Sequence, residues 1–192
     1  MKKFAFLSRL SRRVSSLGRD QRGVSAVEFA LILPLMVTLY LGVVEVSTGV
    51  AIQRKVTLTA RTAADLASQA MSINNADMSN IKTAAAAVMA WCMAPCAFSS
   101  AQLTVTISAV NIDADGVAKV AWSDTLNGTA RATDDVVTVP AALNVANTQL
   151  IWSEVSYSYT PDVGYVVTGT MNLADQIYMR PRLSETIARP NS

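Results

Sequence analysis

Glu28 stands near the start of a long apolar stretch, and its charge needs a chemical explanation. No Lys or Arg occurs from Val24 to Gln53. A carboxylate at the centre of a lipid-embedded helix costs roughly 2.5 to 3.5 kcal/mol, and less near the interface. Two explanations stay open. Glu28 is solvated at headgroup depth near a helix N-terminus, whose dipole favours an anion, or it is neutralised by a positive partner.

A source of positive charge lies four residues upstream of Glu28, at the bond between Gly23 and Val24. Hydrolysis of that bond would leave an ammonium group on Val24. Residues four apart on a helix are neighbours on one face, so the new amine and the carboxylate would neutralise each other, within a chain or between chains. A processing site combined with a charge pair is therefore the form that the second explanation would take.

The apolar stretch itself predicts one transmembrane helix, because about 20 apolar residues cross a hydrocarbon core about 30 Å thick. Residues 1–23 hold seven Lys or Arg and a single acidic residue, Asp20, whereas only Arg54, Lys55 and Arg61 follow the helix closely. Cytoplasmic flanks carry the excess of basic residues. We therefore expect a cytoplasmic leader at 1–23, a transmembrane helix at 24–52 and the bulk of the chain outside.

Composition narrows the function classes. The 192 residues are 51% apolar and 16% charged, which suits a membrane anchor joined to one small domain. The basic residues concentrate in the leader and act as a topology signal, so we predict no nucleic-acid partner. The chain has no histidine, and it offers no phosphate-cradling glycine loop or acidic cluster at metal-ligand spacing. We predict no enzymatic activity, no cofactor and no metal.

The segment Arg22-Gly-Val-Ser-Ala-Val-Glu-Phe29 resembles the processing site of type IV prepilins. Its Glu28-Phe29 pair resembles the Tad (tight adherence, Flp) pilus branch and its TadE-like pseudopilins. The strand that begins Ile151-Trp-Ser-Glu and the closing Tyr178-Met-Arg-Pro-Arg are similar to the C-terminal sheet of that family. The leader, unlike a secretory signal, precedes the apolar region rather than containing it.

This resemblance implies a minor pilin (pseudopilin) that a prepilin peptidase cleaves after Gly23, with Val24 as the new N-terminus. It implies a structural subunit that is needed for pilus assembly, adhesion and surface colonisation. The implied partners are the major Flp pilin, other TadE-, TadF- or TadG-like minor pilins and the inner-membrane assembly platform. The implied location is the inner membrane with a periplasmic head, and possible incorporation into the pilus. The alternative is an uncleaved single-pass envelope protein whose outer domain binds a ligand or partner.

Two further residues of the apolar helix need interpretation. Pro34 lacks an N–H, which leaves the carbonyl of Ala30 without its usual partner and predicts a kink or local unwinding. In pilins such a weak point could melt during assembly, although lipid-embedded helices also tolerate proline without any such role. Glu45 lies near the far end of the helix, and we expect it to be solvated at the outer interface.

Beyond the membrane, the pattern predicts an α+β, pilin-like domain. Apolar residues at helical spacing extend the first helix through 53–71, and a head follows at 72–192. A second helix is expected from about Met78 to Met93, capped by Asn75 or Asp77. Alternating residues predict an antiparallel sheet of about four strands. These strands are expected near 102–109, 117–123, 149–159 and 171–180, with an exposed loop at 124–135.

The remaining candidate groups each have two interpretations. Cys92 and Cys96 predict a disulfide in an oxidising compartment; a redox pair is the alternative, although the spacing is C-x3-C rather than C-x-x-C. The turn at 113–116 also matches the opening of a calcium loop, but Trp122 stands where that loop needs Glu.

The strand aromatics predict packing more than an exposed binding surface. They are Trp152, Tyr157, Tyr159 and Tyr178. Glu154 is expected to pair with Arg180 or Arg182 at the surface.

Overall fold

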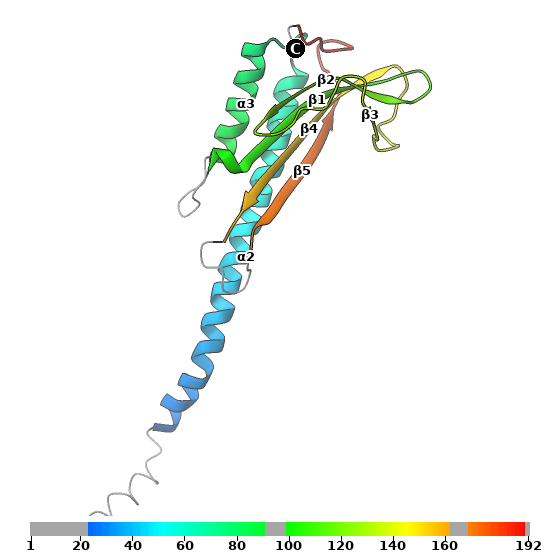
Figure 1. Ribbon diagram of the computed structural model, residues 1–192. Helices are drawn as coiled ribbons and strands as arrows, with labels where there is room; N and C mark the ends of the chain where they lie inside the picture. The colour runs from blue at the N-terminus through cyan, green and yellow to red at the C-terminus, as the bar shows by residue number, and fades with distance from the viewer. Residues whose placement is uncertain (1–22, 91–98, 162–168, 191–192) are drawn as a thin grey trace, which may run out of the picture.

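The structure is a computed structural model, and it describes residues 23–90, 99–161 and 169–190. Its longest element is α2, which runs from Val24 to Ser68 without a break. At 1.5 Å per residue its 45 residues span about 67 Å. Figure 1 shows the lower part of α2 extending away from the head as a stalk, while the upper part lies behind the sheet. The expected continuation of the membrane helix into the head is therefore confirmed.

The second helix, α3, spans Asn75–Ala90 and begins with a reciprocal cap. The backbone N–H of Asp77 donates to Asn74 Oδ1 at 2.9 Å, and the N–H of Asn74 donates to Asp77 Oδ2 at 3.1 Å. This is the capping-box arrangement, with Asp in the place usually held by Glu. The predicted cap was wrong, since Asn74 holds that position, and the helix starts about one turn earlier than expected.

The sheet is antiparallel, and its strand order is β3-β2-β1-β4-β5. The central strand β1 (Leu103–Ile112) follows a short 3-10 helix and pairs with β2 (Ala118–Leu126) and β4 (Thr148–Tyr159). The edges are β5 (Met171–Met179) and the two-residue β3 (Val136–Val137). The α+β class is confirmed, and β3 adds a fifth strand to the four that the alternating patterns predicted.

One face of the sheet, here called the inner face, packs against α2 and α3. Leu103, Val105 and Ile107 of β1 are fully buried there, as are Val56, Ala60 and Ala63 of α2. The alanines are small enough to let the backbone of α2 approach the strands closely, and burial of the larger aliphatic side chains supplies the stabilisation, about 25 cal/mol per Å². The apolar residues that recur at helical spacing in the second half of α2 are thus the residues that pack this helix against the sheet.

The opposite face, here called the outer face, has a second apolar cluster at one end only. Val110 and Leu150 pack there with Val139 from the segment after β3. The loop predicted at 124–135 was partly wrong, because β2 continues to Leu126. Further along, Val120 bonds to Asp134 and Asp135 through backbone groups at 2.8 and 3.0 Å. The rest of the outer face is polar.

The hairpin between β1 and β2 is closed by Asp113. Its Oδ1 accepts the backbone N–H of Asp115 at 3.0 Å and that of Val117 at 2.8 Å. Gly116 has φ of +80°, a backbone conformation that favours glycine. These contacts give Asp113 a turn-forming role, which is the interpretation preferred over a calcium loop.

The segment after β5 ties the far end of α2 to the sheet. Ile187 donates its N–H to Gln149 Oε1 at 2.6 Å and accepts the indole N–H of Trp122 at 2.8 Å. Arg182 forms an ion pair with Asp65 of α2. The pairing of Glu154 with Arg180 or Arg182 was wrong, because Glu154 instead bonds to Arg131, a residue outside the strands.

Asp124 is the shared acceptor of two basic residues between α3, β2 and the C-terminal segment. Lys82 Nζ lies 2.8 Å from Oδ1, and Arg189 Nη2 lies 2.6 Å from Oδ2. Burial raises the pKa of Asp124, but the hydrogen bonds and charges of Lys82 and Arg189 outweigh it and hold the pKa below its ordinary value of 3.8. The ionised carboxylate therefore stabilises the folded head.

We expect Asp124→Asn to lower the free energy of unfolding by about 2 kcal/mol at pH 7, because charged hydrogen bonds are lost while Arg189 stays buried. The contribution is present above the unfolded pKa and is lost as the pH falls through the lower folded pKa. Wild-type stability should therefore fall below about pH 4 more steeply than that of the variant. Urea titration of the full chain in detergent, followed by tryptophan fluorescence, measures both effects.

The matched control for this experiment is Asp115→Asn, which makes the same chemical change on an exposed turn residue. Its unfolding free energy should stay close to that of the wild type. Equal losses in the two variants would show that the contacts of Asp124 contribute nothing specific.

Candidate functional site

The candidate site is the lower half of α2, where apolar side chains are exposed. From Val24 to Val44 no residue is buried, and Phe29 and Leu31 have exposed fractions of 65% and 75%. This length corresponds to roughly 31 Å of helix, which matches the hydrocarbon core of a bilayer. Within the described residues, α2 is the one helix long and apolar enough to cross a membrane. These properties fit a single-pass membrane protein.

Gly23 directly precedes the first helical residue and is exposed. Its φ of −86° is open to any L-amino acid, and a Cβ placed there would meet no atom within 4 Å. Neither backbone conformation nor packing within the described residues requires a glycine at this position. The choice of glycine is therefore explained by something other than the fold.

Glu28 is exposed on the first turns of α2, one helical turn beyond Val24. Among the residues that the structure describes, Glu28 has no ion-pair partner. The helix geometry places the carboxylate and the backbone nitrogen of Val24 along the same face, and the helix dipole favours the anion near this end. Phe29, next in the chain, belongs to the exposed apolar surface of the stalk.

Pro34 lies within α2, which remains helical on both sides of it. The hydroxyl of Thr38 donates to the carbonyl oxygen of Pro34 at 2.8 Å. This bond does not reach the carbonyl of Ala30, which is the group that proline leaves without its usual partner. Because α2 runs unbroken through Pro34, local unwinding is absent from this conformation, and a role for Pro34 as a weak point during assembly remains a prediction.

The boundary between stalk and head lies at Glu45, and this corrects the expectation that Glu45 is solvated. Its exposed fraction is 4%, and it takes part in an interaction within the chain. One turn further, Gly49 is also buried, and a Cβ there would lie 3.5 Å from the terminal methyl of Met171. The end of the sheet therefore covers this face of α2 directly above the membrane-spanning part.

A stripe of residues with a spacing of four connects α2 to β5. After Glu45 and Gly49 it continues with Gln53, whose Nε2 donates to the Ala174 carbonyl at 3.1 Å, and with Thr57, whose hydroxyl donates to Asp175. We did not predict these contacts. The signal was available, because polar or small residues at every fourth position interrupt an otherwise apolar helix and mark one face.

Some of the predicted site residues lie where the structure gives no description. Cys92 and Cys96 lie outside the described residues, as does the leader before Gly23. Within the described ranges, no group of three His, Cys, Asp or Glu side chains is placed to hold a metal ion.

The aromatic residues lie on both faces of the sheet. Tyr157 and Tyr159 contribute to the inner core, while Trp152 stacks on Tyr178 on the outer face with ring centroids 5.3 Å apart. Burial raises the pKa of Tyr178, and the nearby Glu154 charge adds to this rise against the smaller effect of Arg131. Packing therefore accounts for these side chains, as predicted.

Comparison with known proteins gives one match. A search of curated proteins and a search of solved structures each returned no match. The model of the family described as "TadE-like protein" matches residues 23–65, which run from the glycine before α2 through the membrane-spanning part and into the head. Residues 23–65 thus match the TadE-like family, which confirms the predicted resemblance and is consistent with a TadE-like protein of the Tad pilus system.

Proposed function

We propose that this chain is a minor pilin (pseudopilin) of a Tad (Flp) pilus, a structural subunit rather than a catalyst. The observation that carries the proposal is the division of α2. One unbroken helix presents an exposed apolar half at Val24–Val44 and buries its other half in the head. A subunit built in this way can move its apolar half from lipid into a bundle of similar helices while the head stays folded, because no residue from Val24 to Val44 is buried among the residues that the structure describes.

The proposed processing step is removal of residues 1–23 by a prepilin peptidase. The exposure of Gly23 and the space around its Cα support this step, because recognition by a peptidase gives the glycine a purpose that the fold does not. In the proposed orientation, the seven basic residues before the helix hold the leader in the cytoplasm, and the head lies in the periplasm.

The proposed role of Glu28 is to set the position of the helix among its neighbours. Cleavage would create an ammonium group on Val24, and the carboxylate lies one helical turn away. In a low-dielectric environment two opposite charges at this spacing are far more stable together than apart. When Glu28 pairs with the Val24 ammonium group of a neighbouring subunit, a shift along the helix axis would separate the two charges, which favours one register. The proposed partners are the major Flp pilin, other TadE-, TadF- or TadG-like minor pilins and the inner-membrane assembly platform, and the biological outcome is adhesion and colonisation.

Mass spectrometry of the chain purified from its native cell tests the processing step. We expect the mature N-terminus at Val24 in the wild type. Gly23→Val should remain unprocessed yet insert and fold normally, because the added side chain meets no atom within 4 Å at its Cβ. Gly18→Val, in the same leader, should still be cleaved. A wild-type chain that retains residues 1–23 would contradict the proposal and favour an uncleaved envelope protein whose outer domain binds a ligand.

A second experiment tests the charge. Glu28→Ala and the nearly isosteric Glu28→Gln should both reduce surface pili, counted by electron microscopy, to the level of a strain lacking this chain. Membrane fractionation should show normal insertion, because loss of a charge makes the helix easier to place in lipid. Ser25→Ala, a change on the same turn, should leave pili intact. Normal piliation in Glu28→Ala would remove the carboxylate from the assembly mechanism.

A further inference from the structure

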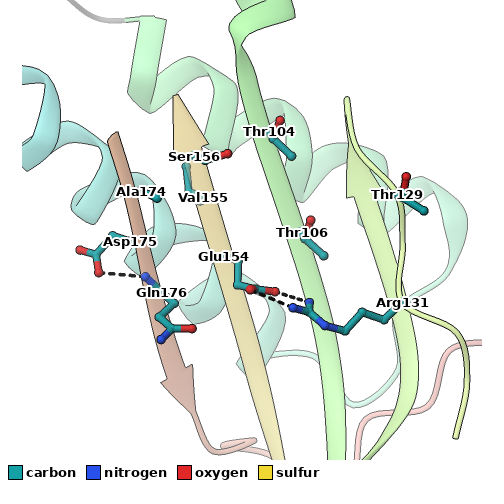
Figure 2. Close-up of a pocket in the computed structure, with 10 residues that line it drawn as sticks. All are labelled: Thr104, Thr106, Thr129, Arg131, Glu154, Val155, Ser156, Ala174, Asp175 and Gln176. Atoms are coloured by element: carbon teal, nitrogen blue, oxygen red, sulfur yellow. Dashed lines mark hydrogen bonds and ion pairs between the residues drawn. The ribbon is translucent and has the colours of Figure 1, made fainter. Parts of the chain in front are cut away.

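A groove of about 660 Å³ lies on the outer face of the head, far along the chain from the stalk. Its floor is formed by β1, β4 and β5, and its wall by the segment that follows β2 (Figure 2). This volume lies within the range of small-molecule sites in proteins, about 300 to 1,000 Å³. The second apolar cluster covers the other end of the outer face, so the groove is the part of this face that stays open.

The floor of the groove carries hydrogen-bonding groups with spare capacity. Ser156 and Thr129 have hydroxyls without a partner among the described residues. Gln176 accepts the indole N–H of Trp152 on its Oε1 at 3.2 Å, which leaves the two amide N–H groups as donors. Thr106 shares a hydrogen bond of 3.1 Å with Thr125 and retains acceptor capacity. The groove therefore offers donors and acceptors side by side.

An ion pair between Arg131 and Glu154 crosses the groove, as Figure 2 shows. Both carboxylate oxygens accept from the guanidinium, with Nη2 at 2.9 Å from Oε1. The guanidinium also lies over the indole of Trp152, 3.9 Å from the ring centroid. Two of the five N–H donors of Arg131 serve Glu154, and the carboxylate keeps free lone pairs. The pair thus adds a rigid donor and a rigid acceptor next to each other.

Charge and shape exclude several ligand classes. The charged side chains that face the groove are Arg131 and Glu154, which neutralise each other, whereas the carboxylate of Asp175 points away from them (Figure 2) and accepts from Thr57 of α2. An ionic ligand would therefore lose hydration in the groove without gaining a net electrostatic attraction. Trp152 is 8% exposed beneath Arg131 and beside Tyr178, which removes it as a platform for an aromatic or fatty ligand. A neutral, polar ligand is the class that remains.

The neighbouring sheet edge argues against a peptide added as a further strand. In the middle of β5, the carbonyl of Ala174 accepts from Gln53 and the N–H of Gln176 donates to Asp175 Oδ1 at 2.8 Å. An added strand needs these backbone groups as partners. Side chains of this chain already occupy them, so a ligand must be recognised by the groove floor.

We propose that the groove binds a neutral saccharide. Each sugar hydroxyl both donates and accepts a hydrogen bond, and adjacent hydroxyls match the adjacent donor and acceptor groups of Ser156, Gln176 and the Arg131–Glu154 pair. Because no aromatic ring is free to stack on the sugar, the dissociation constant is expected in the millimolar range. The inference goes beyond the pilus proposal and does not depend on cleavage or on Glu28, so either can fail alone.

The indole N–H groups of Trp152 and Trp122 provide the measurement. In the full chain held in detergent and labelled with nitrogen-15, titration with chitotriose or cellotriose should shift the indole resonance of Trp152 with a millimolar dissociation constant. The resonance of Trp122, whose indole bonds to Ile187 inside the core, should stay in place and also reports that each variant is folded. A trisaccharide of galacturonate, which is anionic, should bind at least tenfold more weakly.

Ser156→Leu should weaken binding at least tenfold by filling the floor of the groove. Ser158→Leu is the matched control, since both serines are half-buried on the same face of β4 and only Ser156 lines the groove; its dissociation constant should stay within twofold. The proposal is overturned if neither neutral sugar shifts Trp152, if galacturonate binds as tightly, or if both serine variants behave alike. A Trp152 shift caused by a Ser/Thr-rich peptide instead of either sugar would make the groove a peptide site, which also overturns it.

Discussion

The structure depends on one helix, α2, whose two halves have different surroundings. Along its first half α2 exposes Leu, Val and Phe side chains in all directions, as a hydrocarbon environment allows. Along its second half the exposed large aliphatic residues give way to alanines on one face, and these alanines bring the helix close to the sheet. Lipid accepts any bulky apolar side chain, whereas a packed protein interior accepts only those that fit. The change from bulky to small residues therefore sets where the membrane part ends and the head begins.

The local features of the fold could be read from the sequence. Helical spacing of Val56, Ala60 and Ala63 predicts the continuation of α2, and strict alternation from Leu103 to Ala109 predicts a strand, although the polar face of that strand is more buried than alternation suggests. These patterns depend on near neighbours, so they are visible without the fold. The start of α3 was missed by one turn because Asn74 and Asp77 cap each other, and several polar residues nearby could hold the same position.

The errors arise where partners are distant in the sequence. Glu45 was expected in water because nothing near it in the sequence reveals that the folded chain buries it; one turn further along α2, Met171 at the start of β5 lies against Gly49. Glu154 was assigned an arginine that follows β5, yet its partner Arg131 comes from the segment after β2. A loop that folds back across the sheet leaves no periodic signal. In the candidate site the motif from Gly23 to Glu28 was readable as chemistry, whereas only the structure shows that no described residue packs where a Cβ of Gly23 would lie.

The occupied edge of β5 has a consequence for solubility in crowded conditions. Unprotected edge strands join neighbouring molecules into aggregates and fibres, and proteins protect them in various ways. Here Gln53 and Asp175 occupy two backbone groups in the middle of the edge, the Ala174 carbonyl and the Gln176 N–H. Many copies confined to the plane of a membrane would collide often. The occupied backbone groups would make it harder for such collisions to produce irreversible cross-β aggregates. In a membrane, contacts between copies would then fall to the apolar stalks, and lipid could replace those contacts again.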